Sequence, residues 1–246
     1  MEIIRAERLD VGYGTQVVLR GMSFSVPKGR ITVIVGESGS GKSTLLKALI
    51  GLAPPLSGEV YVAGQRIDFN SERDIGRLYR RIGVLYQNSA LLNSLSLYHN
   101  VALPIRMHHP EWPRDKERER VRDMLARVGL DGNQDKFPFE LSGGMRKRAA
   151  LARAMVLEPE IIFCDEPSAG LDPITSAGLD ELLTGLRAAH GVTFVVVTHE
   201  LRSIARIADR VLVLHGGAIR FDGEYADLPA SPDPYLRTFF LRKAAP

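Results

Sequence analysis

The sequence has little cysteine and no long apolar run. A single cysteine, Cys164, excludes a disulfide within the chain and suits a reducing compartment. No apolar stretch approaches the roughly 20 residues that a membrane-spanning helix needs. The start of the chain shows no basic stretch followed by an apolar one, so we expect no secretory signal. If the protein works at a membrane, we expect it to do so from the cytoplasmic side, through a partner.

The chain also lacks a strong charge excess, internal repeats and low-complexity segments. Its 246 residues carry a net charge of +3, with 45% hydrophobic and 25% charged residues. These values are typical of an ordinary globular domain. The basic excess is too weak to predict a nucleic-acid partner. The length suits one large domain, or one domain with an inserted lobe.

What the chain does contain is a glycine loop between a strand and a helix. Residues 31–35 are a β-branched run typical of a buried strand, and residues 45–50 are typical of a helix. The loop between them fits the phosphate-loop motif G-x-x-x-x-G-K-[ST]. Its glycines let backbone N–H groups point at one phosphate, and the helix adds its positive dipole end. The predicted phosphate-binding residues are Gly36, Glu37, Ser38, Gly39, Ser40, Gly41, Lys42, Ser43 and Thr44.

Three side chains in or near this loop are suited to a nucleotide. Lys42 can reach the β- and γ-phosphates, and the Ser43 hydroxyl can ligate Mg²⁺. Tyr13 stands between two glycines earlier in the chain. It can stack on adenine, which is worth about 1–3 kcal/mol, or it can be a turn tyrosine with a half-buried ring.

Polar residues also follow three further predicted strands. Asp165 and Glu166 follow the buried run 161–164, where Asp165 can hold the Mg²⁺ shell and Glu166 can polarise an attacking water. Gln87 can hydrogen-bond a Mg²⁺-bound water or cap a loop. His199 can touch the γ-phosphate. Two acids at the end of a strand beside a phosphate loop predict phosphoryl chemistry.

A second glycine motif lies in residues 141–145, directly before a basic helix over 146–157. Ser142 is well placed to cap that helix, and Gly143 and Gly144 expose backbone N–H groups at its positive end. This pattern predicts either a second anion site or a plain helix cap.

The remaining pattern predicts the organisation of the chain. We expect two or three short strands over 2–26, a loop broken by Pro104, Pro110 and Pro113, and an amphipathic helix over 115–129. A hairpin is predicted where 211–214 and 218–221 flank a glycine turn. The predicted parts of the single domain 1–246 are a nucleotide-binding core (1–87 and 158–228), a helical lobe (88–157) and a C-terminal tail (229–246), which is a short helix packed on its own domain or on a partner.

Together these motifs resemble the ATP-binding-cassette (ABC) ATPases, and the resemblance covers nearly the whole chain. The matching residues are Tyr13, 36–44 (Walker A), Gln87 (Q-loop), 141–145 (signature), 161–166 (Walker B), 169–172 (D-loop) and His199 (switch). One departure is Met145, where the commonest signature has glutamine. Because Ser142 and Gly144 are intact, we expect hydrolysis to be preserved.

The resemblance implies an α/β fold with a mixed RecA-like core sheet, an N-terminal antiparallel β subdomain and an inserted α-helical lobe. It implies ATP and Mg²⁺ as cofactors and a head-to-tail homodimer, in which the signature of one subunit closes over ATP on the other. The implied nucleotide-binding residues are Tyr13, Gly36 to Thr44, Ser142, Gly143, Gly144 and Asp172. The implied catalytic residues are Lys42, Gln87, Glu166 and His199. The implied Mg²⁺ ligands are Ser43, Gln87 and Asp165.

Segments flanking the motifs, 87–92, 100–104, 141–155 and 165–175, look like the ATPase subunits of Mla-type systems. These systems pair with Mce-type binding proteins and move phospholipids between bacterial membranes. The resemblance therefore implies a permease partner and a place at the cytoplasmic face of the inner membrane.

Other cargo remains open, such as an amino acid or ion importer or a lipoprotein-release system. A soluble ABC protein of DNA repair or translation is a further alternative. It is disfavoured because the sequence shows no tandem cassette, long coiled coil or zinc insert. A catalytically silent scaffold is disfavoured by Lys42, Asp165, Glu166 and His199.

Overall fold

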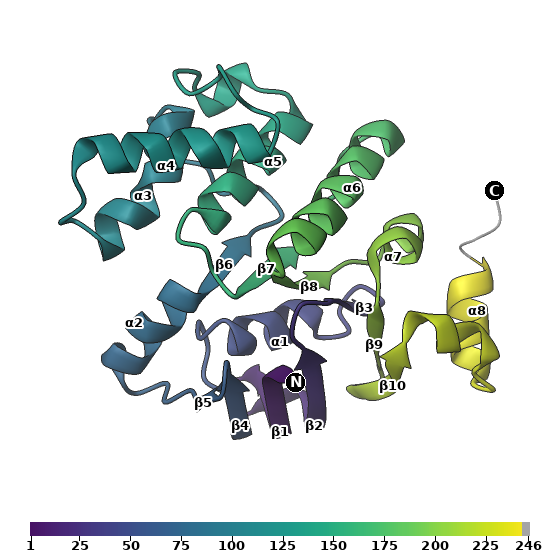
Figure 1. Cartoon of the computed structure of the whole chain (residues 1–246). Helices are drawn as coiled ribbons and strands as arrows, with labels where there is room; N and C mark the ends of the chain where they lie inside the picture. The colour runs from purple at the N-terminus through teal and green to yellow at the C-terminus, as the bar shows by residue number, and fades with distance from the viewer. Residues whose placement is uncertain (243–246) are drawn as a thin grey trace.

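Two β-sheets and a group of helices make up the protein in the computed structural model, which describes residues 1–242 (Figure 1). The larger sheet consists of β3 (Ile31–Gly36), β6 (Ile82–Leu85), β7 (Ile161–Asp165), β8 (Thr193–Val197), β9 (Arg210–His215) and β10 (Ala218–Glu224). Its strand order is β10-β9-β3-β8-β7-β6. Neighbouring strands are parallel, except that β9 and β10 form an antiparallel hairpin. The predicted mixed core sheet and hairpin are thereby confirmed.

The central strands of this sheet are buried on both faces. Every residue of β3 is buried, and its side chains alternate between two cores, with Ile34 in one and Val33 and Val35 in the other. A parallel strand covered on both faces needs apolar side chains at every position, because neither face meets water. This explains why the sequence of β3 is a continuous β-branched run and not an alternating one.

The smaller sheet is antiparallel, as the family resemblance implies. It consists of β1 (Glu2–Tyr13), β2 (Gln16–Pro27), β4 (Ser57–Val62) and β5 (Gln65–Arg66), in the order β2-β1-β4-β5. The expectation of short strands over 2–26 is wrong, because β1 and β2 are each 12 residues long. Their pairing shifts register several times, for example between Ala6 and Leu9. Such bulges interrupt the two-residue alternation from which a long strand is recognised in sequence.

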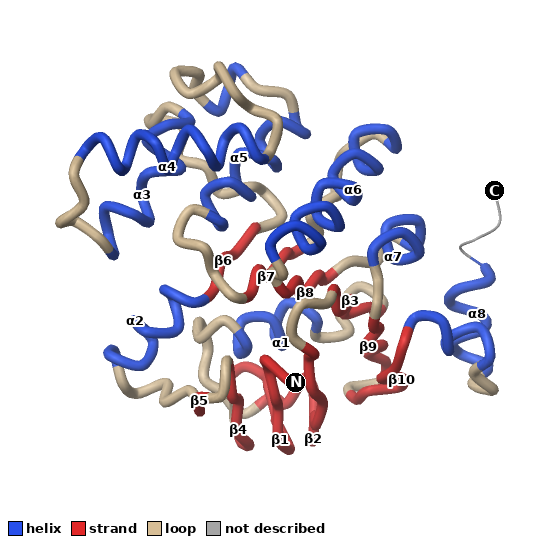
Figure 2. Tube along the Cα trace, viewed as in Figure 1, coloured by secondary structure: helices blue, strands red, loops and turns tan. Residues whose placement is uncertain are grey.

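Helix α1 (Lys42–Leu49) lies between the two sheets (Figure 2). Its buried Leu45 and Leu49 belong to the core that also contains residues of β1, β2 and β3. The helix begins at Lys42, earlier than the predicted span 45–50. The end of the glycine loop is therefore already the first turn of the helix.

A helical lobe stands above the larger sheet in Figure 1. It contains α3 (Leu97–His108), α4 (Arg114–Arg127), the 3₁₀ turn η1 (Pro138–Glu140) and α5 (Gly143–Met155). The expectation that Pro104 lies in a loop is wrong, because it lies inside α3. Val101, Ala102 and Ile105 of this helix are fully buried. Their packing stabilises a helix that local proline chemistry disfavours.

The remaining helices are α2 (Glu72–Arg81), α6 (Pro173–His190), α7 (Leu201–Ile207), the 3₁₀ helix η2 (Tyr225–Ala230) and α8 (Pro234–Arg242). Helix α8 is the short helix expected in the tail, and its Leu236 and Phe239 join the main core. The Tyr235 ring also lies over His215, with 3.8 Å between ring centroids. The part of the tail that the structure describes, residues 229–242, thus packs on its own domain, and residues 243–246 lie outside the described residues. No helix within residues 1–242 is both long and apolar enough to cross a membrane.

The parallel strands bring four sequence motifs to one edge of the sheet. Val197 at the end of β8 is level with Ile34 of β3 and with Asp165 of β7, and Leu85 of β6 is level with Cys164. The carboxyl ends of parallel strands share one edge, where ligands of open α/β sheets bind. The segments that continue from these four strands therefore meet.

Candidate active site

The loop that joins β3 to α1 is shaped by its glycines. Gly39 and Gly41 have φ of +81° and +95°, in the left-handed region that favours glycine. A Cβ on Gly41 would lie 2.8 Å from Leu19 and 2.9 Å from Val18, so the position also has no room for a side chain. No side chain of residues 1–242 caps the start of α1. The N–H groups of its first turn are therefore available to an anion.

Lys42 lies within this loop and is only 9% exposed. Its ammonium donates to the carbonyl oxygens of Gly36 at 2.8 Å and Glu37 at 2.9 Å. The buried Ser40 hydroxyl has no hydrogen-bond partner within the described residues. A bound phosphate fits this arrangement, because its oxygens accept hydrogen bonds from the first-turn N–H groups, the ammonium and the hydroxyl.

Tyr13 ends β1 beside the loop. Its hydroxyl lies 3.2 Å from Oγ1 of Thr44, a hydrogen bond that lowers the pKa of Tyr13. The residue is 55% exposed, and the Lys47 ammonium lies 5.6 Å from the ring centroid. The hydrogen bond holds the tyrosine at the edge of the loop while part of its surface stays open. Adenine stacking on this ring stays a prediction.

Glu166 is held from several sides at the end of β7. Its Oε1 is hydrogen-bonded to Nδ1 of His199 at 2.7 Å, and its Oε2 accepts from the Thr198 hydroxyl at 3.0 Å. Its backbone has φ of +45°, a left-handed conformation that costs a non-glycine residue about 1–3 kcal/mol. Its N–H donates to the carbonyl of Val197 at 2.8 Å. A carboxylate fixed in this way is suited to orient a water.

Asp165 and Cys164 precede Glu166 and differ in their surroundings. Burial raises the pKa of Asp165, and the neighbouring Glu166 adds to this, while Lys42 and Lys147 lower it. Lys42 of the loop is therefore near enough to act on Asp165 electrostatically. The side chain of Cys164 is fully buried, which raises the pKa of its thiol to about 12. Cys164 is thus an inert part of the core.

The predicted Mg²⁺ ligands are a hydroxyl, a carboxamide and a carboxylate. Ser43 opens α1, Gln87 lies two residues beyond β6, and Asp165 ends β7. Ser43 and Gln87 are exposed, and Asp165 is partly buried. Oxygen donors in this small number fit Mg²⁺, which keeps waters and substrate phosphates as its other ligands. The sequence prediction of this site is compatible with the structure and stays a prediction.

The signature residues lie at the start of α5, next to the start of α6. The Ser142 hydroxyl accepts from the N–H of Met145 at 3.3 Å and so caps α5, while Asp172 caps α6. A Cβ on Gly144 would lie 2.4 Å from Cγ2 of Thr175. Glycine at this position lets the two helix starts approach each other. The structure therefore brings the signature next to the D-loop, and it places the phosphate loop, Gln87, Asp165, Glu166 and His199 at the ends of β3, β6, β7 and β8.

Two residues with contacts in this site were not singled out from the sequence. They are Thr198, which donates to Glu166, and Lys147, whose ammonium donates to the carbonyl oxygens of Gln87 and Glu166. A signal for Lys147 exists, because it falls on the buried face of α5 with Gly144, Leu151 and Met155. A charged residue among apolar residues at helical spacing points to a buried polar contact.

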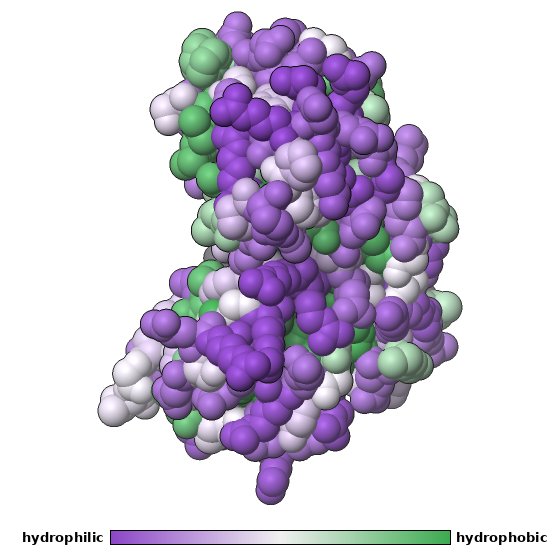
Figure 3. Space-filling model, turned by 60° about the vertical axis from the view of Figure 1, so that its left-hand side comes forward, coloured by the Kyte–Doolittle hydropathy of each residue, from purple (hydrophilic) through white to green (hydrophobic). Residues whose placement is uncertain are grey.

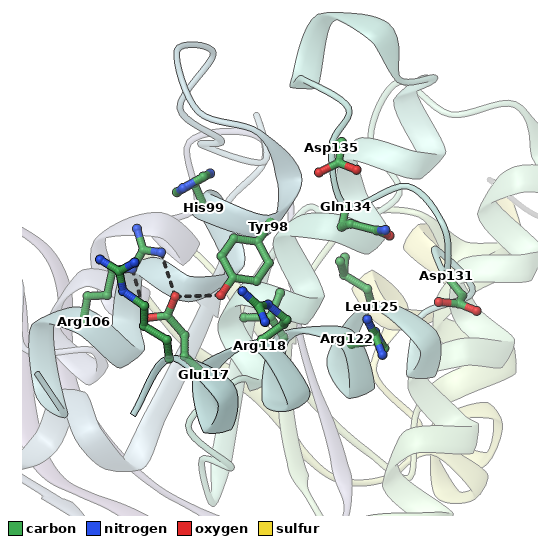
Figure 4. A pocket seen from close by; sticks show the side chains of 12 residues that line it. Tyr98, His99, Arg106, Glu117, Arg118, Arg122, Leu125, Asp131, Gln134 and Asp135 are labelled. Carbon is green, nitrogen blue, oxygen red and sulfur yellow. Dashed lines mark hydrogen bonds and ion pairs between the residues drawn. The ribbon is translucent and has the colours of Figure 1, made fainter. Parts of the chain in front are cut away.

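A separate hollow of about 700 Å³ lies on the helical lobe (Figure 4). At one end Glu117 of α4 lies between Arg106 and Tyr98 of α3. Arg106 binds Glu117 through two nitrogens, at 2.7 and 3.0 Å, and the Tyr98 hydroxyl donates at 2.8 Å. These hydrogen bonds join the two helices and hold the pKa of the Glu117 carboxyl below its usual range.

We expect Glu117→Gln to lower the free energy of unfolding at neutral pH by about 1–2 kcal/mol, because a charge-assisted pair in a half-exposed setting is lost. A carboxyl whose pKa is depressed on folding stabilises the protein above its unfolded pKa of about 4.3. That contribution disappears as the pH falls through the lowered folded pKa, so the difference from wild type should shrink as the pH is lowered below the unfolded pKa. Urea unfolding at several pH values measures both effects. Glu119→Gln, at an exposed position on the same helix, is the control, and equal stability of Glu117→Gln and wild type at pH 7 contradicts the prediction.

A glycine loop that opens a helix, beside a fixed glutamate and a further carboxylate at the ends of parallel strands, defines an ATPase of the phosphate-loop class. The particular family follows from sequence comparison. The chain belongs to the ABC transporter family, whose sequence profile matches residues 19–169. As a member of this family it is an ABC ATPase.

Curated relatives include ATP-binding subunits with different cargo in their names. The chain is 40% identical, over 92% of its length and 84% of the relative's, to the intermembrane phospholipid transport system ATP-binding protein MlaF of Escherichia coli. It is 38% identical, over 96% of its length, to the probable ribonucleotide transport ATP-binding protein mkl of Mycobacterium tuberculosis. It is 39% identical, over 86% of its length, to the methionine import ATP-binding protein MetN of Carboxydothermus hydrogenoformans. The chain spans 66% of mkl and 62% of MetN.

Solved structures share the fold over almost the whole chain. The structure of cbiO1 from Clostridium perfringens, part of the ABC transporter complex cbiONQ, has a TM-score of 0.86 at 30% identity and covers 98% of this chain and 96% of that one. A dimeric ATP-binding cassette in a post-hydrolysis state, bound to ADP and phosphate, has a TM-score of 0.80 at 29% identity, over 90% of this chain and 98% of that one. The predicted fold class is therefore confirmed.

Proposed function

We propose that this ABC transporter ATPase drives the movement of phospholipids between bacterial membranes, together with a permease and an Mce-type lipid-binding protein. The observation that carries the proposal is the 40% identity to MlaF, which extends over 92% of this chain and 84% of MlaF. The match to MlaF covers most of both chains, whereas the chain spans smaller shares of mkl and MetN. The proposed location is the cytoplasmic face of the inner membrane, where the protein is held by its permease.

The proposed hydrolysis uses the residues gathered at the sheet edge. Lys42 and the first-turn N–H groups of α1 bind the phosphates, and Tyr13 stacks on the adenine. Glu166 orients and deprotonates the attacking water. The Oε1 atom of Glu166 is itself held by a hydrogen bond with Nδ1 of His199 at 2.7 Å. Mg²⁺, when held by Ser43, Gln87 and Asp165, neutralises charge on the phosphates.

A second copy of the chain completes the proposed site. Within one chain, Gly144 of the signature packs against Thr175 near the start of α6, and Ser142 caps α5. In a head-to-tail homodimer the signature of one subunit would close over the ATP held by the other. ATP favours the closed dimer to the extent that it binds closed subunits better than open ones. The dimeric cassette among the solved relatives supports this arrangement.

An apolar groove between the core and the helical lobe is the proposed docking site for the permease. Its volume is about 380 Å³, and its lining includes Leu52, Tyr86, Leu103 and Met107. Met107 is 69% exposed and Leu52 is 52% exposed, so the groove offers apolar surface to a partner. Figure 3 shows one face of the molecule, which is largely hydrophilic with scattered hydrophobic residues, and an outline that narrows between an upper and a lower lobe.

A second candidate keeps the ATPase and changes the cargo. The 39% identity to MetN, over 86% of this chain, favours an importer of an amino acid as the alternative. The two candidates differ in the binding protein that accompanies the permease. Identification of that partner therefore separates them.

The test is purification of tagged Glu166→Gln protein from membranes of its own bacterium in mild detergent, with ATP present. We expect a multi-spanning permease, an Mce-type protein and bound phospholipid to copurify. The matched sample without ATP controls for contacts that do not depend on the closed dimer. Recovery of a permease with an amino-acid-binding protein would replace the cargo and keep the ATPase, whereas recovery of no membrane protein overturns the transport proposal.

A further inference from the structure

Lys147 is a buried cation that the hydrolysis described above does not use. It lies in the second turn of α5 and is 4% exposed. Removing an ammonium group from water is costly, so a buried lysine needs polar partners that offset its desolvation. Burial also lowers the pKa of Lys147. Cys164 and Asp165 of β7, and Glu166 directly after it, act in the opposite direction and raise this pKa. The identity of its partners therefore shows what the residue does.

Both hydrogen-bond partners of the ammonium are backbone carbonyls of active-site residues. The Lys147 ammonium donates to the carbonyl oxygen of Gln87 and to that of Glu166, the latter at 3.3 Å. Gln87 leaves β6 on the way to the helical lobe, and Glu166 follows β7. One side chain on the signature helix is thus joined to two separate segments of the sheet edge.

The contact with Glu166 is made where the backbone needs support. Glu166 has φ of +45°, and such a conformation persists only where the surroundings hold it. Its N–H is fixed by Val197, and its carbonyl oxygen accepts from Lys147 and from the N–H of Ala169 at 3.2 Å. The peptide groups on both sides of the Glu166 Cα are therefore restrained. Their orientation sets the direction of the carboxylate that faces Thr198 and His199.

We propose that Lys147 is a positioning residue for ATP hydrolysis, which acts by tying the signature helix to the backbone of Gln87 and Glu166. The inference rests on the role proposed above for Glu166. A shift of α5 relative to the sheet moves the ammonium away from one or both carbonyl oxygens. The position of the helical lobe is thereby coupled to the alignment of the attacking water, without any contact between Lys147 and the nucleotide.

The first variant is Lys147→Met, which has an unbranched side chain of similar length and no donor. We expect kcat for ATP hydrolysis to fall about 10- to 100-fold, because small displacements of a reacting group cost about this much. We expect KM and the affinity for a fluorescent ATP analogue to stay within about twofold, because the phosphate loop is untouched. Lys147→Arg, which keeps a cation with N–H donors, should regain about tenfold over Lys147→Met. Lys116→Met, at an exposed position on α4, is the control for the same chemical change.

The outcomes separate this inference from the proposed function. Absence of ATP hydrolysis by the wild type overturns the proposed function. Loss of hydrolysis in Glu166→Gln, with kcat of Lys147→Met within about threefold of wild type, overturns only the role of Lys147. A change in ATP affinity alone, or an arginine variant no more active than the methionine variant, overturns it as well. If Lys147→Met does not fold, Lys147→Gln, whose amide is one bond shorter, should show the same fall in kcat at unchanged ATP affinity, and an unchanged kcat overturns the proposal.

Discussion

Glu166→Gln should abolish turnover while leaving ATP binding intact. Removal of a general base costs about 10²–10⁴-fold in rate. The amide keeps the shape of the side chain and can still accept from Thr198, whose hydroxyl lies 3.0 Å from Oε2 in the wild type. Because the phosphate loop is unchanged, ATP should still bind and should hold two subunits together without being consumed. Phosphate release measures turnover, and size-exclusion chromatography with and without ATP measures the dimer.

The matched control is Glu181→Gln, at an exposed position of α6. This variant should hydrolyse ATP like the wild type and should not accumulate as a dimer. Near-normal turnover in Glu166→Gln would contradict the assignment of Glu166 as the general base. A variant that neither turns over nor dimerises with ATP would contradict the prediction that ATP holds two Glu166→Gln subunits together.

Lys42→Met should remove most of the affinity for ATP. Loss of one partner from a desolvated charge pair costs about 2–5 kcal/mol, which is roughly 30- to 4,000-fold in Kd. Lys42 is 9% exposed and lies against the loop carbonyls of Gly36 and Glu37. Its ammonium is therefore already placed where the phosphates are expected. Isothermal titration with ATP and Mg²⁺ gives the affinity directly.

A thermal unfolding series provides the second measurement for Lys42. A ligand that binds only the folded state stabilises it by RT ln(1 + [L]/Kd), so ATP should raise the Tm of the wild type and not that of Lys42→Met. Lys28→Met is the control, because Lys28 pairs with Glu160 on the surface at 3.2 Å, away from the loop. Equal ATP-induced shifts in wild type and Lys42→Met contradict the assignment of the phosphate site.

Much of the site is predictable because its parts are local in sequence. A glycine loop must follow a strand and open a helix to bind phosphate, and residues 36–44 carry that requirement within one short segment. The end of β7 is equally local, since an apolar run followed by Asp165 and Glu166 places two acids at the end of a strand. Parallel strands share their carboxyl edge, so the loop, the acids and His199 could be expected to meet.

Other features are hidden from local patterns. The bulges of β1 break the alternation that identifies a long strand. Pro104 is a residue type that normally ends a helix, but Val101 and Ile105 of the same helix are fully buried, and their packing keeps the helix intact. In both cases packing against distant residues outweighs the local preference. A window of sequence contains no information on that packing.

The phosphate loop, the acids and the order of the motifs are recognisable in the sequence because each depends on residue types at short fixed spacing, and the family resemblance that they carry predicts the α/β class. How these parts contact one another depends on the folded chain. The ammonium of Lys147 bonds to Gln87, 60 positions away, and the Thr198 hydroxyl bonds to Glu166, 32 positions away. Such contacts arise from the order of β6, β7 and β8 in the sheet and from the way α5 packs on that sheet. They are set by the packing of elements far apart in the chain, so the periodicity of α5 can indicate that Lys147 is buried but not which residues it contacts.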